Sequence, residues 1–133
     1  METKNTKTKT ILIVDDDIDL LLQLKLQFEA AGFTVITAES AREAEKAFAQ
    51  TRPDIAVLDL MMEQMDTGFT LSYHIKKKDP SIPVILITGV THETGFEFEV
   101  SSAEERSWIK ADAILDKPIR FEQLMREVER LMK

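Results

Sequence analysis

Short, purely apolar runs recur along the chain, and they constrain its fold more than any other feature. The runs occupy residues 11–14, 55–58, 84–87 and, more weakly, 113–115. They are rich in β-branched residues and apolar at consecutive positions, as in strands of a parallel sheet that is covered on both faces. A more alternating segment, 33–38, fits a strand nearer an edge. The sequence therefore predicts five strands.

Segments of helical periodicity lie between these runs. Leu21, Leu24 and Phe28 follow helical spacing and precede Gly32, a natural C-terminal glycine. Ser40 stands three residues before a glutamate, which is the spacing of a capping box at the start of a second helix. Two helices are thus predicted, one on each side of the segment 33–38.

Two more helices are predicted at residues 69–78 and 121–132. The last of them carries a continuous apolar stripe opposite charged residues. Strands that alternate with helices predict an α/β fold with right-handed crossovers and a doubly wound parallel sheet.

Residues 89–110 interrupt this alternation. They show no helical stripe, except for a short helix at 103–109, and form an unusually long loop between the fourth and fifth strands. The Lys/Thr-rich residues 1–9 are predicted to be a flexible tail, which leaves one domain at 10–133.

Composition excludes several classes of function. The formal net charge of −7 disfavours direct nucleic-acid binding, and no run approaches the length of a membrane span. The absence of cysteine removes disulfides, thiolate metal sites and a cysteine nucleophile, and it fits a reducing compartment. The chain is therefore predicted to be soluble and cytoplasmic, with no membrane insertion.

Polar residues follow four of the five apolar runs. Asp15 and Asp16 follow the first run, Asp59 the run at 55–58, Thr88 the run at 84–87, and Lys117 closely follows the last. Ligands of open parallel sheets bind outside the carboxyl ends of the strands, where these side chains would meet. The set predicts a functional site at this edge.

The residue types at this edge suggest phosphoryl chemistry. Crowded carboxylates need a cation, and oxygen ligands favour Mg²⁺. With Asp15, Asp16 and Mg²⁺ in place, the Asp59 carboxylate can attack a phosphoryl group, while Lys117 and Thr88 supply donors for its oxygens. Asp17 is better explained as a helix cap than as a ligand.

These motifs resemble the receiver domain of bacterial response regulators, the CheY-like family. They are Val14-Asp15-Asp16, Asp59-Leu60-Met61-Met62 with Met65-Asp66, Ile87-Thr88-Gly89 and Asp116-Lys117-Pro118. The resemblance implies the flavodoxin-like strand order 2-1-3-4-5. It also implies a stand-alone signalling module, not an enzyme, that takes a phosphoryl group from a sensor histidine kinase or phosphotransfer protein.

The resemblance also assigns roles to residues. It makes Asp59 the phosphoacceptor, Asp15, Asp16 and Asp59 ligands of Mg²⁺ together with the Met61 backbone carbonyl, Thr88 the switch hydroxyl and Lys117 the phosphoryl contact. The expected output is a changed affinity for an unknown downstream protein, and a phosphorylation-dependent homodimer remains open.

Two positions depart from the family's usual pattern, and two others bear on dephosphorylation. Ile114 stands where an aromatic residue usually couples to the switch hydroxyl, and Glu63 stands where a proline is common. Met61 and Val90 occupy positions that influence attack by water on the acyl phosphate. Because both are apolar, we expect slow spontaneous dephosphorylation.

Two other interpretations remain open at this stage. A small Mg²⁺-dependent phosphohydrolase of the haloacid-dehalogenase kind would use Asp15 as its nucleophile, although such an enzyme needs a further acidic motif after its lysine. A receiver-like binding module would keep the fold and switch without phosphorylation, as Ile114 and the long loop encourage. The complete set of carboxylates, hydroxyl and lysine argues against the latter.

Overall fold

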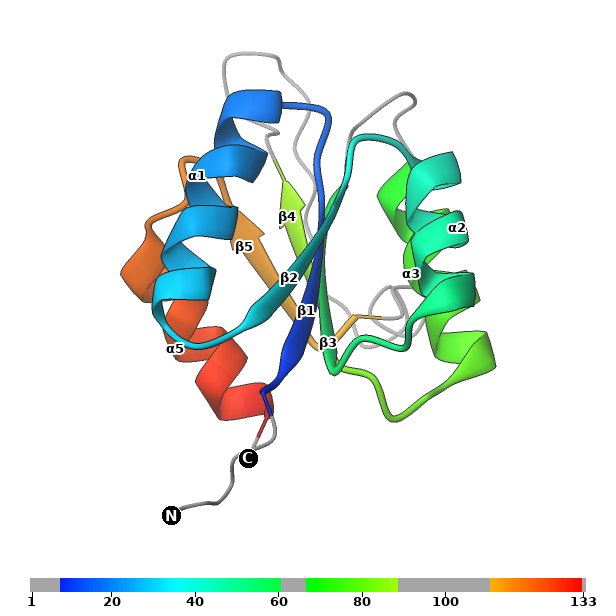
Figure 1. Cartoon of the computed structure of the whole chain (residues 1–133). Helices are drawn as coiled ribbons and strands as arrows, with labels where there is room; N and C mark the ends of the chain where they lie inside the picture. Colours follow the sequence, from blue (N-terminus) through cyan, green and yellow to red (C-terminus); the bar gives the residue numbers. More distant parts are fainter. Residues whose placement is uncertain (1–7, 61–66, 89–110, 133) are drawn as a thin grey trace, which may run out of the picture.

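A computed structural model describes residues 8–60, 67–88 and 111–132 of the chain. Its strands form one parallel sheet in the order β2-β1-β3-β4-β5 (Figure 1). The strands are β1 (Thr10–Val14), β2 (Thr34–Ala38), β3 (Ile55–Asp59), β4 (Val84–Thr88) and β5 (Ala113–Asp116). The five predicted strands and the doubly wound α/β fold are therefore confirmed, together with the strand order that the resemblance implied.

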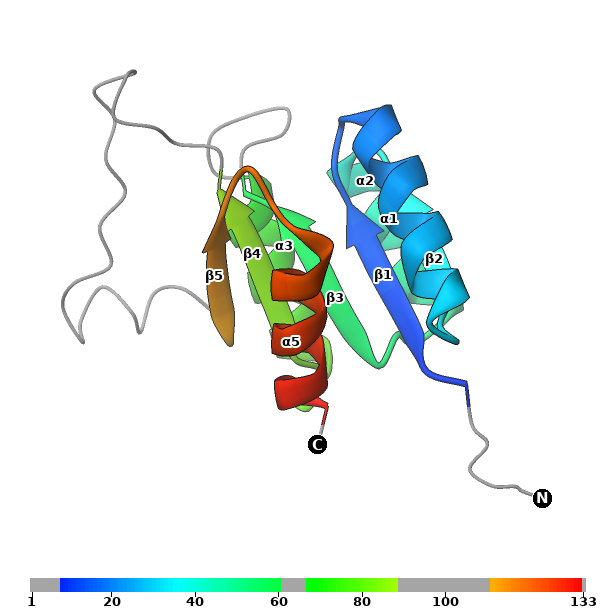
Figure 2. The ribbon, with the colours of Figure 1, turned by 90° about the vertical axis from the view of Figure 1, so that its left-hand side faces the viewer.

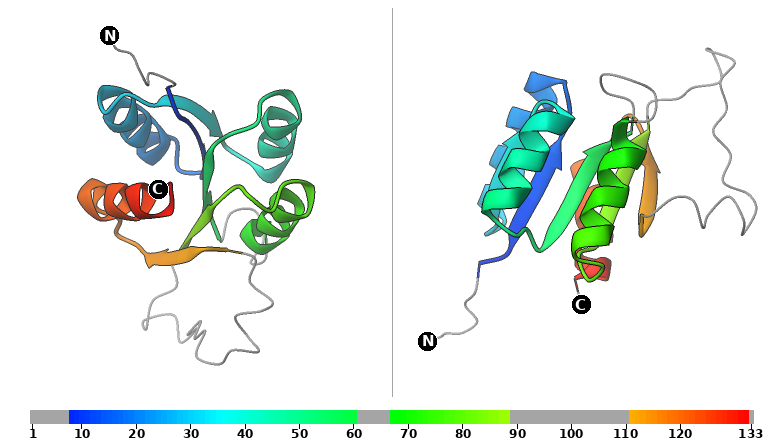
Figure 3. Two further views of the ribbon diagram at one scale, coloured as in Figure 1. Left: turned by 90° about the horizontal axis from the view of Figure 1, so that it is seen from below. Right: turned by 90° about the vertical axis from the view of Figure 1, so that its right-hand side faces the viewer.

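Helices cover both faces of the sheet. They are α1 (Ile18–Ala30), α2 (Ala41–Gln50), α3 (Thr67–Lys78) and α5 (Phe121–Leu131). Helices α1 and α5 lie on one face and α2 and α3 on the other (Figure 3). The two faces of the sheet accordingly build two apolar clusters, and β1, β3 and β4 are buried between them.

The end of α1 is fixed by a Schellman motif. Gly32 adopts a φ of +99°, which an L side chain rarely adopts. The N–H of Phe33 donates to the carbonyl of Phe28, and that of Gly32 donates to Glu29. The rings of Phe28 and Phe33 meet edge to face at 5.3 Å, which supplies the apolar contact typical of this motif. The predicted helix end at Gly32 is confirmed.

The start of α2 also follows its predicted capping signal. The Ser40 hydroxyl accepts the N–H of Glu43 at 3.1 Å, while the Glu43 carboxylate accepts the N–H of Glu39 at 2.9 Å. Helix α3 begins at Thr67, two residues before the predicted start at Phe69. The glycine at position 68 obscured this start, because glycine has a low helix propensity.

Two predicted segments lie outside the described residues. They are the short helix at 103–109, within the long connection between β4 and β5, and most of the tail at 1–9. Among the residues that the structure describes, no helix is long and apolar enough to cross a membrane. Figure 2 shows β4 and β5 side by side with α5 packed against them.

The amino-terminal edge of the sheet is held by paired side chains. Asp54 accepts the N–H of Thr10 at 2.8 Å, and Asp112 accepts that of Val84 at 2.8 Å. Asp112 also forms a 2.7 Å ion pair with Lys76 of α3. These carboxylates therefore satisfy the first N–H groups of two strands and tie distant segments together.

Candidate functional site

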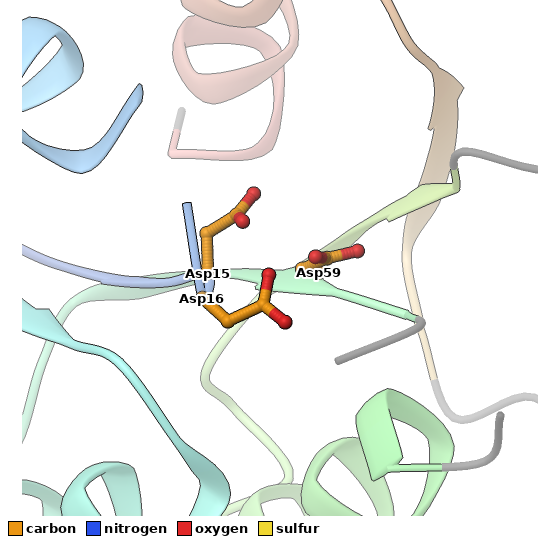
Figure 4. A group of neighbouring side chains, drawn as sticks. All are labelled: Asp15, Asp16 and Asp59. Carbon is orange, nitrogen blue, oxygen red and sulfur yellow. The ribbon is translucent and has the colours of Figure 1, made fainter. Parts of the chain in front are cut away.

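The two acidic segments predicted from the sequence meet at the carboxyl edge of the sheet. Val14 pairs with Leu58 in the parallel register of β1 and β3, so the residues that follow both strands lie side by side. The backbone N–H of Asp15 continues the β1–β2 ladder by donating to Ala38 at 3.1 Å. Figure 4 shows the carboxylates of Asp15, Asp16 and Asp59 gathered at this point.

These three residues can offer a compact set of oxygen ligands. One carboxylate oxygen of each lies within 4.8 Å of the others. Asp15 is 2% exposed and Asp59 3%, whereas Asp16 faces solvent. Buried carboxylates this close repel one another, and hard oxygen donors suit Mg²⁺, which retains several waters and takes few protein carboxylates. The donor set therefore fits a small divalent cation that is reached from the solvent side through Asp16.

The Asp15 carboxylate is oriented by its own turn. Its Oδ1 accepts the backbone N–H of Asp17 at 2.9 Å, while its Oδ2 lies 3.3 Å from the Lys117 ammonium. Asp17 in turn caps α1, because its side chain accepts the N–H of Leu20 at 3.1 Å. The predicted role of Asp17 as a helix cap is thus confirmed.

Lys117 supplies the positive charge of the described site through its ammonium group. Its ammonium lies 3.5 Å from Asp59 Oδ2, in addition to the contact with Asp15, and its side chain is 31% exposed. Partial burial lowers the pKa of Lys117, but the charges of Asp59 and Asp15 outweigh that effect and raise the pKa above its ordinary value of 10.5. The ammonium thus contacts two of the three carboxylates, and the cluster of three keeps an excess of negative charge.

Thr88 completes the set at the end of β4. It is 6% exposed, and its carbonyl accepts the N–H of Lys117 at 2.8 Å. This bond continues the β4–β5 ladder by one residue beyond Asp116 and keeps Thr88 next to Lys117. The structure therefore brings Asp15, Asp16, Asp59, Thr88 and Lys117 to one edge, as the strand ends predicted.

The positions that depart from the family's pattern are only partly described. Ile114 pairs with Leu86 in the register of β4 and β5 and is 38% exposed. Met61, Glu63 and Val90 lie outside the described residues, so the carbonyl ligand and the residues expected to govern dephosphorylation remain predictions. An apolar, part-exposed side chain thus stands next to the site's strand in place of an aromatic ring.

One functional contact was missed by sequence reasoning. The N–H of Asp17 holds the Asp15 carboxylate, but Asp17 was interpreted only as a cap. The signal was available, because an aspartate side chain often accepts the backbone N–H of the residue two positions later, as in an Asx turn. His74 lies outside the carboxylate cluster, and its Nδ1 is 2.7 Å from a carboxylate oxygen of Glu45, between α3 and α2.

Comparison with known proteins places this geometry in a family. Residues 11–129 match the response regulator receiver domain. The virulence transcriptional regulatory protein PhoP of Salmonella typhimurium is 32% identical over 92% of this chain and 51% of its own length. A CheY-like receiver from Methanospirillum hungatei is 28% identical with a TM-score of 0.77, and 94% of each chain is covered.

A third similar protein was solved with ligands bound. The response regulator TrrA of Thermotoga maritima, solved in complex with Mg²⁺ and BeF, is 29% identical with a TM-score of 0.75 over 93% of this chain and 99% of its own. The chain belongs to the receiver domain family of two-component response regulators. It spans about half or less of the length of the curated relatives it matches.

Proposed function

We propose that Asp59 accepts a phosphoryl group from a phosphohistidine on a histidine kinase or phosphotransfer protein, in a reaction that requires Mg²⁺. The observation that carries this proposal is the position of Asp59: it is buried beside two further carboxylates and lies 3.5 Å from the Lys117 ammonium. Family membership supports the same chemistry. A cytoplasmic location is part of the proposal and agrees with the absence of cysteine.

The proposed transfer needs little beyond positioning and neutralisation of charge. A carboxylate oxygen of Asp59 forms the new O–P bond while the N–P bond of the donor histidine breaks, and that nitrogen keeps the bonding electron pair. The Lys117 ammonium, held by a carboxylate on each side, is placed to donate to a phosphoryl oxygen. Thr88, next to it at the end of β4, is the proposed second donor.

Mg²⁺ would be held by the carboxylates of Asp15, Asp16 and Asp59, with the Met61 carbonyl as a further proposed ligand. The Asp15 carboxylate is already oriented by the Asp17 N–H. When bound, the ion neutralises negative charge on the carboxylates and on the phosphoryl oxygens. The donor set supports this assignment because it consists of carboxylate oxygens with an exposed member. The Mg²⁺–BeF complex of TrrA, a protein with the same fold, supports it further.

The outer face of α1 supports docking of the donor protein. Ile18, Leu22 and Leu26 are 60%, 56% and 59% exposed and are spaced at four-residue intervals, so they form one stripe along the helix. The stripe begins at Ile18, three residues after Asp15 and two after Asp16. A helical partner lying on α1 would therefore bring a histidine over the edge that carries Asp59.

Phosphorylation is proposed to change the affinity for a downstream protein through β4, β5 and α5. Thr88 lies at one end of β4, and the neighbouring Ile114 lacks the bulk and polarity of an aromatic switch residue. We therefore expect the rearrangement to rely on Thr88 and the strands. Slow dephosphorylation is also expected, because Met61 and Val90 cannot orient water; a lifetime of seconds at neutral pH would contradict this expectation.

Intact-mass spectrometry tests the proposed function. The protein is incubated with acetyl phosphate and MgCl₂, in parallel with Asp59→Asn and with Asp19→Asn as a matched control. Asp19 is an exposed aspartate in the first turn of α1, outside the carboxylate cluster. One added phosphoryl group is expected on the wild type and on Asp19→Asn, with none on Asp59→Asn.

Other results would support the competing functions. A phosphatase activity that is lost in Asp15→Asn but retained in Asp59→Asn would identify a hydrolase with Asp15 as nucleophile. Absence of an adduct, together with absence of beryllofluoride binding, would indicate a receiver-like module that switches without phosphorylation. If acetyl phosphate phosphorylates the wild type, fresh unphosphorylated protein should also accept the group from a purified phosphotransfer domain. Leu22→Glu should slow that transfer without slowing reaction with acetyl phosphate.

A further inference from the structure

The first turn of α1 and the carboxylate cluster share one hydrogen-bonded segment. Asp17 caps the helix through its side chain, and its backbone N–H holds Oδ1 of Asp15 at 2.9 Å. The first backbone bond of α1 also ends at this residue, because Leu21 donates to the Asp17 carbonyl at 3.0 Å. The side chain, the N–H and the carbonyl of the exposed Asp17 thus all take part in joining α1 to the buried Asp15 carboxylate.

We propose that Asp17 is a positioning residue for the cation and phosphoryl site, acting through Asp15 and not as a ligand. This inference rests on the proposed function. Oδ1 of Asp15 is fixed by the Asp17 N–H, so Oδ2 is left facing Lys117 and the interior of the cluster. If the carboxylate rotated, the spacing of the three oxygen donors would change.

The capping side chain is what keeps this N–H in place. Residues 16 to 19 are all exposed, so tertiary packing does little to hold the turn between β1 and α1. An unpaired N–H in the first turn frays a helix end, and the side chain at the cap prevents that fraying. Loss of the cap is therefore expected to free the Asp17 backbone and, with it, the Asp15 carboxylate.

The test compares four variants, which remove the cap of α1, a charge near it, or the cap of another helix. Asp17→Ala removes both the cap and the charge, whereas Asp17→Asn removes only the charge, since asparagine caps as well as aspartate. Ser40→Ala removes the equivalent cap of α2, whose 3.1 Å bond matches that of Asp17 but involves no residue of the cluster. Asp19→Asn removes a charge from the same turn without removing the cap.

Two quantities are measured in each variant. The first is the apparent Mg²⁺ dissociation constant from an NMR titration of backbone amides with MgCl₂. The second is the hydrogen-exchange rate of the amide of residue 17 in the metal-free protein. Residues that orient a metal ligand change metal affinity by roughly 10-fold to 100-fold when they are removed, so about a 10-fold weaker affinity is expected for Asp17→Ala.

The expected pattern also includes faster amide exchange in Asp17→Ala, with near wild-type values of both quantities in Asp17→Asn, Asp19→Asn and Ser40→Ala. Equal weakening in Asp17→Asn would show that charge is responsible, and equal weakening in Ser40→Ala would show an effect of general stability. Either result would overturn the inference, as would unchanged exchange in Asp17→Ala.

Failure of the proposed function is distinguishable from failure of this inference. A wild type that binds Mg²⁺ but forms no phosphoryl adduct would reject phosphorylation, while the Mg²⁺ titration of the variants would still test the role of Asp17. A wild type that binds no Mg²⁺ gives a different result. Faster exchange in Asp17→Ala would then show only a helix cap, and the inference is overturned because no cation site is left for Asp17 to position.

Discussion

The two edges of the sheet use aspartate in opposite ways. At the amino-terminal edge, Asp54 and Asp112 accept strand N–H groups, and Asp112 also pairs with an ammonium. At the carboxyl edge, three carboxylates lie close together, and the Lys117 ammonium contacts two of them. The first arrangement satisfies each charge and stabilises the fold. The second leaves an excess of negative charge, which the proposed cation would neutralise.

The largest effect on this contrast is expected from Lys117→Met. Breaking a buried ion pair costs about 3–5 kcal/mol, and the partial exposure of Lys117 reduces the expected loss of unfolding free energy to about 2 kcal/mol at neutral pH. Because the pKa of Lys117 is raised in the folded protein, its contribution is complete below pH 10.5 and is lost as the pH rises through the folded-state value. Urea denaturation of both proteins measures the difference.

Mg²⁺ provides the control for this variant. A bound cation replaces the missing ammonium, so added MgCl₂ should recover most of the stability lost in Lys117→Met. Saturation at about 100 times the dissociation constant stabilises a protein by about 2.7 kcal/mol. A variant that remains equally unstable in MgCl₂ would show that Lys117 acts through packing of its stem and not through charge.

The corresponding change at the amino-terminal edge is Asp112→Ala. It leaves the buried N–H of Val84 without its carboxylate acceptor and Lys76 without its partner, which should lower the unfolding free energy by about 1–2 kcal/mol. In contrast to Lys117→Met, this loss should not respond to MgCl₂. Asp112→Asn keeps an oxygen acceptor and should recover part of the stability. Recovery of Asp112→Ala by Mg²⁺ would remove the proposed difference between the edges.

Asp16→Asn should change stability in the opposite direction. It removes one like charge from the cluster, and two unit charges 4 Å apart in water interact by about 1 kcal/mol, so the metal-free protein should become more stable by up to about 1 kcal/mol. The same variant should lose the stabilisation by MgCl₂, because a proposed ligand is gone. Thermal denaturation with and without the salt measures both effects, and a destabilised metal-free variant would contradict the account of crowding.

The smallest effect concerns Asp79 at the amino-terminal edge. Hydrogen bonds from Ser81 and Arg52 lower the pKa of Asp79 from 3.8 to about 2. Because the folded-state pKa is depressed, the network contributes to stability above pH 3.8, and this contribution is lost as the pH falls toward 2. Carboxyl-carbon NMR should show a titration midpoint near 2 that moves toward 3.8 in Arg52→Ala. An unchanged midpoint would assign the shift to Ser81 alone.

Sequence reasoning was most successful where local pattern and strand direction decide the structure. The apolar runs gave the strands, and Gly32 and Ser40 marked helix ends that the structure confirms. Convergence at the carboxyl edge was also predictable, because parallel strands place their last residues together. The strand order was less accessible, since nearly equivalent apolar runs do not say which neighbour each one pairs with; it came from the family resemblance.

Long-range polar contacts escaped prediction for a different reason. The bond from Thr10 to Asp54 joins residues 44 positions apart, and neither residue carries a local signal for it. Likewise, nothing near Lys76 in the sequence indicates Asp112 as its partner. The orienting bond between Asp17 and Asp15 is local and could have been predicted. It was overlooked because the cap alone already explained the aspartate.

The apolar stripe on α1 has a consequence for the timing of signalling. Three side chains supply only a small part of the roughly 800 Å² per partner that a standard stable interface buries. A complex centred on Ile18, Leu22 and Leu26 would therefore be weak. Because differences in affinity between related complexes lie mainly in the dissociation rate, such a complex would have a short residence time. A donor that leaves quickly can recharge and visit another receiver, so a few donor molecules can load a much larger pool of this protein.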